Sequence, residues 1–492
     1  MQTSIESPTG SRHLQLQPAP RARIGIFGIG LDTYWSQFPG LQKRLQDYVN
    51  TVAARLASPD VDVVNVGLVD NADRAYEAGR ELRRQDVDII FLYVTTYALS
   101  STVLPVVQRA KVPVIVLNLQ PAAAIDYPVF NRLGDRTRMT GEWLAHCAAC
   151  PVPEIANVFK RAGIRFFQVT GMLDDDPGCW REIEAWVRAA RAAAGMNGNR
   201  LGLMGHYYSG MLDIQSDLTL QCMTFGTHIE HLEVDELSGL RREVTAPEIA
   251  ERVREFRELL DVQADCSEES LSDAARTSVA LDRLVSRHRL GSLAYFYKGT
   301  GVPENEATIA SIIVGSSLLT ARHVPVAGEY EVKNAQAMKI MDILGAGGSF
   351  TEYYAMDFND DVVIMGHDGP GHIAIAQGKT KVRPLQVYHG KVGRGISVEM
   401  AVKHGPVTLL SVIEGENGQL ALLCAEGESV AGPILEIGNT NSRYRFACGA
   451  REFVNRWNRH GPAHHCAVGT GHIASDLAKL GQLLGIETHQ VC

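Results

Sequence analysis

The sequence predicts an α/β protein in which two α/β domains precede a C-terminal domain rich in β-strands. Early in the 492-residue chain, short apolar strands alternate with amphipathic helices, and a similar alternation follows. After Glu329, strand patterns separated by turns dominate. Alternation favours parallel sheets, whereas successive strands and turns favour antiparallel ones. We expect a disordered leader at 1–22, an N-terminal α/β domain at 23–170, a central α/β domain at 171–325 and the β-rich domain at 326–492.

The N-terminal domain is expected to hold a parallel, doubly wound sheet. Its strands are predicted at 23–30, 61–68, 87–94 and 112–119, and its helices at 41–56, 71–84 and 101–109. Ligands of such sheets bind beyond the carboxyl ends of the strands. Those ends carry polar groups suited to a sugar: Asp32, Tyr34, Thr95, Thr96, Asn118 and Gln120. The run Gly25–Gly30 lacks the G-x-G-x-x-G spacing and does not predict a dinucleotide site.

The central domain repeats the pattern. Strands are predicted at 165–169, 200–205 and 292–297, and helices at 182–193, 281–290 and 307–320, the last of them buried. His206 lies in a loop, where a histidine is more often incidental than a ligand.

The C-terminal domain is predicted to be antiparallel, either a small barrel or a sandwich. Its strands are expected at 350–358, 361–366, 383–388, 396–402, 407–414, 419–425 and 442–445, with a last helix at 473–484.

Composition excludes several classes of protein. A net charge of −9 and a pI near 6.0 do not provide the basic patch that nucleic-acid binding needs. No apolar run is long enough to span a bilayer, and the leader lacks the apolar segment of a secretory signal. The nine cysteines are scattered and odd in number, so we expect no disulfide framework and a reducing cytoplasm. We interpret the single CxxC, Cys147 and Cys150, as small buried side chains rather than as zinc ligands.

The stretch 328–372 combines a helix, a glycine break and a hairpin. Apolar residues at helical spacing predict a helix from Val332 to Leu344, which Gly345 ends. Phe350 to Phe358 then reads as a strand with one apolar face, and Glu352 is the exception on it. A buried carboxylate needs a partner because an unpaired buried charge is costly.

The pairing of this strand with the one that follows the turn suggests a partner for Glu352. With a turn at Asn359–Asp360, Phe358 pairs with Asp361 and Glu352 faces His367, close enough for one ion to bridge them. A slip of one residue would place Asp368 there instead. The alternative to a metal or catalytic site is a structural hydrogen bond between the two strands.

Three segments resemble the L-arabinose isomerase family, within the L-arabinose and L-fucose isomerase-like superfamily. They are GEYEVKNAQAMKIM (328–341), FTEYYAMDFNDDVVIMGH (350–367) and AHHCAV (463–468). In that family a Gly-Glu-x-Asp-x-Lys segment precedes a helix, a strand with a glutamate and a return strand with a histidine follow, and a His-His pair comes last. The resemblance implies two Rossmann-like α/β domains followed by a β-rich, barrel-like C-terminal domain.

The resemblance also implies a site. Glu329, Glu352, His367 and His465 would hold a divalent metal, Mn²⁺ or another such as Co²⁺ or Fe²⁺. Glu329 and Glu352 would also be catalytic, moving protons during aldose–ketose isomerisation through an ene-diol. His464, the alternative to His465 as a ligand, is assigned to the substrate with Tyr34, Thr95 and Gln120. Family members are trimers or hexamers with active sites between subunits, so a homo-oligomer is expected.

Departures from the family concern the sugar rather than the metal. The family has Asp-Tyr after the strand glutamate, where this chain has Tyr353-Tyr354, and the return strand continues as Asp368-Gly-Pro-Gly-His372. Of the family's N-terminal substrate stretch, only Tyr34 is clearly kept. The expected function is therefore a metal-dependent sugar isomerase whose sugar the sequence does not identify. The alternatives are an epimerase, lyase or glycoside-cleaving enzyme on a keto-sugar that uses the same site, or a non-catalytic sugar-binding relative.

Overall fold

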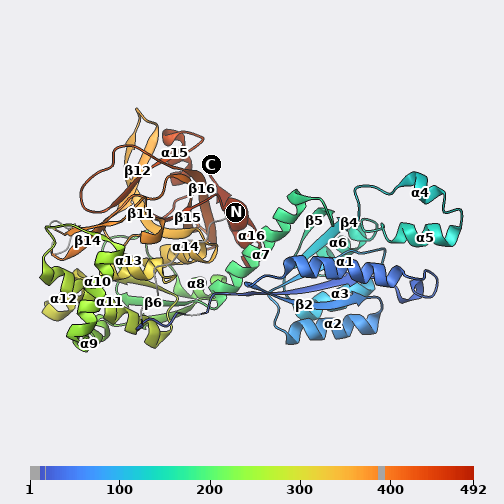
Figure 1. Cartoon of the computed structure of the whole chain (residues 1–492), viewed down its shortest axis with the longest axis horizontal. Helices are drawn as coiled ribbons and strands as arrows, with labels where there is room; N and C mark the ends of the chain where they lie inside the picture. Colours follow the sequence, from blue (N-terminus) through green and yellow to red (C-terminus); the bar gives the residue numbers. More distant parts are fainter. Residues whose placement is uncertain (1–11, 17, 386–393) are drawn as a thin grey trace. The chain divides into compact units, whose positions relative to one another are not determined.

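The computed structural model describes residues 12–16, 18–385 and 394–492. The chain forms two compact units, which we describe separately. The N-terminal unit is Ala19–Ala194, and the C-terminal unit runs from Gly195 to Cys492 with the described residues before Ala19. Figure 1 colours the first from blue to green and the second from green to red.

The N-terminal unit contains a parallel sheet of five strands in the order β2-β1-β3-β4-β5. The strands are β1 (Ala22–Ile29), β2 (Val61–Val69), β3 (Ile89–Tyr93), β4 (Val114–Gln120) and β5 (Phe166–Met172). Its helices are η1 (Asp32–Tyr34), α1 (Leu41–Leu56), α2 (Ala72–Arg84), α3 (Ser100–Ala110), α4 (Tyr127–Asn131), α5 (Arg136–Leu144) and α6 (Val152–Arg161), and α7 (Pro177–Asn197) leads into the other unit. Helices α2, α3 and α6 share one apolar core with the sheet.

The glycine run of β1 has a packing role. A Cβ added at Gly28 would lie 2.4 Å from a methyl group of Val49 on α1, so only glycine lets this helix approach the strand so closely.

The C-terminal unit begins with a second parallel sheet, in the order β10-β9-β6-β7. Its strands are β6 (Arg200–Gly205), β7 (His228–Leu232), β9 (Ser292–Phe296) and β10 (Val326–Ala327). The helices around it are α8 (Leu218–Phe225), α9 (Val234–Arg242), α10 (Ala246–Leu259), α11 (Glu268–His288), α12 (Pro303–Ala310) and α13 (Ile313–Ala321).

One predicted helix in this region is wrong as a single element. The stretch 307–320 is divided between α12 and α13, with a break at Ser311. The Ser311 hydroxyl donates to the carbonyl oxygens of Ala307 and Thr308, at 2.7 and 3.1 Å. Such local bonds compete with the helical ladder, whereas apolar periodicity is the same for one buried helix or two.

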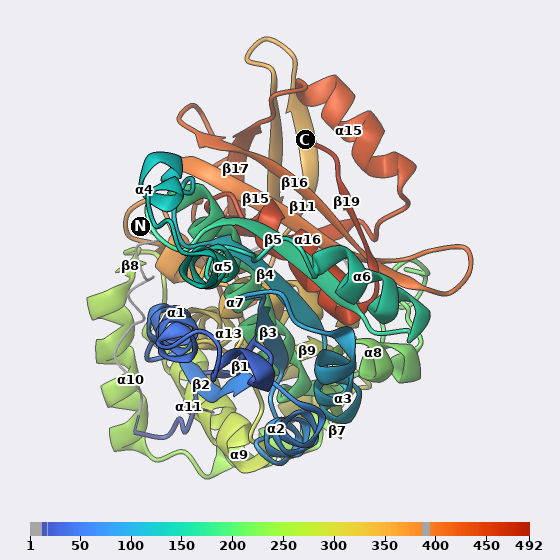
Figure 2. The same cartoon turned by 90° about the vertical axis from the view of Figure 1, so that its right-hand side faces the viewer.

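The rest of the C-terminal unit contains a closed antiparallel barrel, so the predicted fold class is confirmed and the barrel alternative is correct. Six strands follow the order β15-β18-β11-β12-β17-β16, and pairing of β15 with β16 closes the ring. They are β11 (Gly347–Asp357), β12 (Val362–His367), β15 (Gly405–Glu414), β16 (Leu420–Val430), β17 (Thr440–Arg445) and β18 (His465–Thr470), and β19 (Glu487–Gln490) adds to β16 in parallel. Figure 2 shows these strands in orange and red.

Smaller elements complete the unit. They are η2 (Ile373–Ile375), α15 (Ala450–Arg459), α16 (Ala474–Leu484) and a sheet of β8 (Asp261–Val262), β13 (Lys381–Pro384) and β14 (Ile396–Glu399). The strand predicted at 383–388 ends at Pro384 in the structure, and residues 386–388 lie outside the described part of the chain. Within the described ranges, no helix combines the length and apolar character needed to cross a bilayer.

Helix α14 (Val332–Ile343) joins the parallel sheet to the barrel. All of its residues are buried, and it contacts β9 and β10 on one side and β11, β15 and β18 on the other. Because both parts pack on one buried helix, the residues just before α14 are held in a fixed place relative to the barrel strands.

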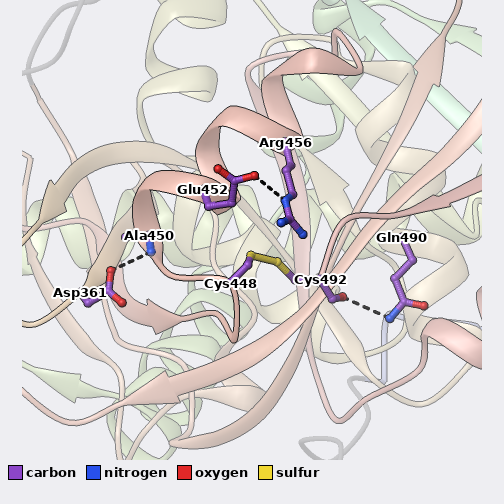
Figure 3. The surroundings of a disulfide bond; sticks show 7 residues. All are labelled: Asp361, Cys448, Ala450, Glu452, Arg456, Gln490 and Cys492. Atoms are coloured by element: carbon purple, nitrogen blue, oxygen red, sulfur yellow. Dashed lines mark hydrogen bonds and ion pairs between the residues drawn. A yellow bond between two sulfur atoms is a disulfide. The ribbon is translucent and has the colours of Figure 1, made fainter.

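One disulfide fastens the C-terminal strand segment to the start of α15. Cys448 and Cys492 are bonded, with their Cα atoms 6.5 Å apart (Figure 3). The sequence predicts no disulfide framework and does not predict this single bond, because folding brings together two residues 44 positions apart that spacing alone could not match. The other cysteines are free; Cys147 is buried as predicted, but Cys150 is exposed, so the prediction of a buried side chain is wrong for Cys150. A disulfide is unusual in a reducing compartment, and the cytoplasmic location stays a prediction.

Candidate metal centre

Glu329 lies just beyond the carboxyl end of β10, in a strained turn. Glu329 and Tyr330 both adopt the left-handed backbone region, with φ of 57° and 63°. Two successive non-glycine residues in this region cost conformational energy and persist only where the surroundings impose them. The Tyr330 N–H donates to the Tyr295 carbonyl of β9 and the Glu331 N–H to that of Gly328, both at 3.0 Å. These bonds fix the backbone of the turn that carries Glu329.

Glu352 lies on β11, between β12 and β18. It is directly opposite His465 on β18 and Gly366 on β12. The predicted pairing of Glu352 with His367 is therefore wrong by one residue. The expected register holds from Ala355, paired with Ile364, to the turn, but a bulge at Tyr354 shifts the inner part of the strand.

The bulge also changes the predicted apolar face. Alternation is interrupted at Tyr354, and Met356 and Phe358 are exposed rather than buried with Phe350. The turn of the hairpin spans Phe358 to Asp361, two residues longer than expected.

Carboxylates and imidazoles converge here from four segments: the turn after β10, and strands β11, β12 and β18. His465 Nε2 lies 3.6 Å from Glu329 Oε2 and 4.0 Å from Glu352 Oε2. His464 Nε2 lies 3.9 Å from the same two oxygens. His367 Nε2, at the end of β12, lies 3.9 Å from Glu329 Oε1. The four residues predicted as metal ligands are thus brought together, and His464 joins them.

This donor set fits a divalent metal. Metal bonds to nitrogen and oxygen of roughly 2.0–2.2 Å place ligand atoms of one ion about 3–4.4 Å apart, which includes every separation above. Glu329, His464 and His465 each offer a donor atom within 4.8 Å of the others. His465 Nε2 is buried and has no hydrogen-bond partner among the described residues, which a metal would supply. Two carboxylates with imidazoles suit Mn²⁺, Fe²⁺ or Co²⁺.

Glu331 orients His465. Its Oε2 lies 2.5 Å from His465 Nδ1, and its side chain is only 1% exposed. Burial raises the pKa of Glu331 to about 8, and burial also lowers the pKa of His465 well below its ordinary value. The hydrogen bond between them holds one proton, either on Oε2 or on Nδ1. When Nδ1 donates that proton, the lone pair of Nε2 faces Glu329 and Glu352, as a ligand requires.

Asp213 orients His464 in the same way. It lies in the segment between β6 and α8, and its Oδ2 accepts from the His464 N–H at 3.0 Å and lies 2.6 Å from His464 Nδ1. Burial lowers the pKa of His464, but the hydrogen bond to Asp213 and the negative charges of Asp213, Glu331 and Glu329 together outweigh it, so the net shift is upward. His464 Nε2 is left facing the two glutamates.

The remaining predicted substrate residues belong to the N-terminal unit. Thr95 is buried, and its hydroxyl donates to the Ile29 carbonyl and accepts from the Ile29 N–H, the latter at 3.2 Å. Tyr34 is half-buried beside Trp35 and Phe38. Gln120 is half-buried at the end of β4. Their role as sugar contacts stays a prediction.

Sequence reasoning missed the two orienting carboxylates. Glu331 stands at the aspartate position of the family segment Gly-Glu-x-Asp-x-Lys, so that motif contained a signal. Asp213 carries no such signal, because it lies 251 residues from His464 in sequence. The strand β18, which sets His465 beside Glu352, was also missed.

Comparison with known proteins supports the resemblance over part of the chain. Residues 347–487 match the family model described as L-arabinose isomerase C-terminal domain. The matched range contains Glu352, His367, His464 and His465, and Glu329 precedes it. No curated protein matches the chain.

Proposed function

We propose that this protein is a metal-dependent aldose–ketose isomerase that acts on an open-chain sugar through an ene-diol. The observation that carries the proposal is the convergence of Glu329 and Glu352 with three histidines, two of which have their own orienting carboxylates. The match of residues 347–487 to a domain of a sugar isomerase family supports it.

The glutamates move the protons in this proposal. Isomerisation transfers a proton between C2 and C1 of the sugar and another between the oxygens O2 and O1. Glu352 lines a cavity beside the site, so it is placed to accept the C2 proton and return it at C1. Glu329, which is less exposed than Glu352, moves the hydroxyl proton. A divalent ion held by Glu329, Glu352, His367 and His465 would polarise the carbonyl and stabilise developing negative charge on oxygen.

The histidines have holding roles. Glu331 and Asp213 fix the ring orientations of His465 and His464, so neither ring loses conformational entropy when metal and sugar bind. His464 is placed to act as a further ligand or to contact a sugar hydroxyl. Mn²⁺ is the proposed native metal, with Co²⁺ or Fe²⁺ as substitutes.

Deuterium exchange tests the proposal. Metal-loaded protein is incubated in D₂O with a panel of pentoses, hexoses and deoxy-sugars, and ketose formation and C2 exchange are followed by NMR. We expect both with at least one sugar, and neither after the metal is removed by chelation. Exchange without ketose would favour the alternative, an epimerase, lyase or glycoside-cleaving enzyme. Bound metal without exchange on any sugar would contradict the proposal.

The assembly and location are proposed from the family resemblance. We expect a homo-oligomer, a trimer or hexamer, in which Tyr34, Thr95 and Gln120 of one subunit act at the metal centre of its neighbour, in the cytoplasm. Light scattering of the purified chain measures its mass in solution. A monomer with full exchange activity would contradict the shared site.

A further inference from the structure

A cavity of about 670 Å³ lies beside the metal centre, in the C-terminal unit. Its walls come from β11, the residue after β12, the end of β13 and the loop between β16 and β17. Cavities of roughly 300–1,000 Å³ hold drug-sized ligands, which are larger than a free pentose. The size of this cavity therefore indicates a substrate with more than a sugar chain.

One part of the lining is polar and suits the sugar. Glu352 and Asp368 contribute carboxylates, and Tyr354 and Asn439 contribute a hydroxyl and an amide. The Asn439 amide donates to the Tyr354 hydroxyl at 2.9 Å, which fixes both side chains. Tyr354, at the bulge of β11, lines the cavity together with Glu352.

Another part of the lining is apolar. Leu435 and Ile437 are 39% and 65% exposed, and Pro384 and Leu385 line the cavity with them. The loop that carries Leu435 is held at defined points, because the Leu435 N–H and carbonyl both bond to the Asn441 side chain, at 2.9 and 2.7 Å. Two large apolar side chains displayed by a fixed loop at a cavity favour an apolar ligand group.

The charge of the lining disfavours an anion. Asp265, Glu352, Asp368 and Glu436 are acidic, and Arg383 is the only basic residue that lines the described cavity. Arg383 is engaged in an ion pair with Glu399 at 3.1 Å. A phosphate group would thus meet net negative charge rather than the arginines that usually bind it.

We propose that the substrate is a neutral sugar with an apolar substituent at the end remote from C1 and C2, and not a free pentose or a sugar phosphate. The inference rests on the proposed function, which places C1 and C2 at Glu352. A substituent at the far end then reaches Leu435 and Ile437, where it loses contact with water.

The experiment separates binding from turnover. Pentitols cannot isomerise, so calorimetry of metal-loaded protein with a free pentitol, its 5-O-benzyl ether and its 5-phosphate measures affinity alone. Burying the ring should tighten binding by about tenfold to a hundredfold, and the phosphate should bind most weakly. The corresponding pentoses, assayed by C2 exchange, should show the same order in kcat/KM.

The outcomes distinguish the two proposals. Equal affinity for the three pentitols, or tightest binding of the phosphate, would overturn the substituent while leaving the isomerase intact. Absence of C2 exchange with every pentose, while the benzyl pentitol binds more tightly, would overturn the isomerase instead.

Single variants locate the substituent. Ile437→Ala and Leu435→Ala should each lower the ratio of benzyl to free pentitol affinity by about threefold to tenfold. Met356→Ala is the matched control, because Met356 is an apolar side chain 43% exposed on β11 that does not line the cavity. An unchanged ratio in Ile437→Ala, together with loss of the oligomer, would show that these residues bind a neighbouring subunit and would overturn the inference.

Discussion

The carboxyl edges of the two parallel sheets look alike in sequence and differ in structure. In the N-terminal unit, the Thr95 hydroxyl at the end of β3 is bonded to the backbone of Ile29. In the C-terminal unit, Glu329 after β10 meets histidines from the barrel. Polar residues beyond strand ends thus mark where a site could form, and a second structure facing that edge decides whether their groups converge.

The two edges also differ in energy. The Thr95 hydroxyl gains two hydrogen bonds inside its own sheet, which stabilises the fold. At the second edge, Glu329 and Tyr330 hold strained backbone conformations, and His465 Nε2 is buried without a hydrogen bond in the described structure. Asn118 Oδ1 at the first edge is also buried without a hydrogen-bond partner among the described residues, so what sets the second edge apart is that several metal-binding side chains converge on its unpartnered atom.

The most direct challenge to this comparison is Glu352→Gln. The amide keeps the size of the side chain but cannot accept the C2 proton, so kcat for C2 exchange should fall roughly 10²–10⁴-fold. Exchange rates and metal content by mass spectrometry measure the effect. Glu416→Gln, on an exposed turn, is the control. Intact activity and metal content in Glu352→Gln would mean that the reaction is not carried out at the second edge.

Glu331→Gln tests whether the orienting carboxylate matters. Replacing the carboxyl group that holds His465 Nδ1 by an amide should weaken Mn²⁺ binding by about tenfold to a hundredfold. Titration of the apoprotein with Mn²⁺, followed by electron paramagnetic resonance, measures affinity independently of turnover. Glu331→Asp restores a carboxylate and should recover part of the affinity. Equal affinities for the two variants would remove Glu331 from the site.

His372→Gln addresses the acid sensitivity of the C-terminal unit. Burial lowers the pKa of His372 to about 4, below the unfolded value of about 6.5. Between these pH values the unfolded chain binds a proton that the folded chain does not, so stability falls as the pH drops, by at most about 1.4 kcal/mol per pH unit. The variant should show a smaller loss of amide protection around β11 between pH 6.5 and 4. An unchanged pH dependence would show that His372 is not buried as described.

Thr95→Val gives the smallest expected effect and examines the first edge. Removing the hydroxyl should lower the free energy of unfolding by about 1 kcal/mol, measured by urea denaturation, because two bonds to Ile29 are lost. The proposed contact with the sugar also predicts a raised KM. An unchanged KM with lowered stability would show that the Thr95 hydroxyl serves only the fold.

Local sequence patterns predicted the bounds of an element well where its buried residues follow the regular period of a helix or a strand. The bounds of α1 and β6 match the sequence-based ones, because each has a regular apolar pattern and a clear end. Strand alternation and register singled out Glu352 and His367, whereas Glu329 and His465 came from the resemblance in three short segments. What local reasoning could not supply is distance in space, so Asp213 and the pairing of Glu352 with His465 were missed.

The predicted register of the hairpin was correct near the turn and wrong by one residue at Glu352. Counting from the turn gave the correct partner for Ala355 and the wrong one for Glu352, because one residue between them is unpaired. A bulge leaves little trace in composition, and its effect is to reverse the face of every residue beyond it.

The bulge at Tyr354 divides the hairpin into two parts whose strand registers differ by one residue, which matters for engineering. The outer part, from Ala355 through the turn to Ile364, can be exchanged for another hairpin tip without rotating Glu352. Deleting Tyr354 alone would remove only the extra residue, because Tyr353 with Met365 and Ala355 with Ile364 would then be adjacent pairs of a regular ladder. Loop grafting in this protein should therefore preserve the pairing of Ala355 with Ile364 and can replace the residues between them.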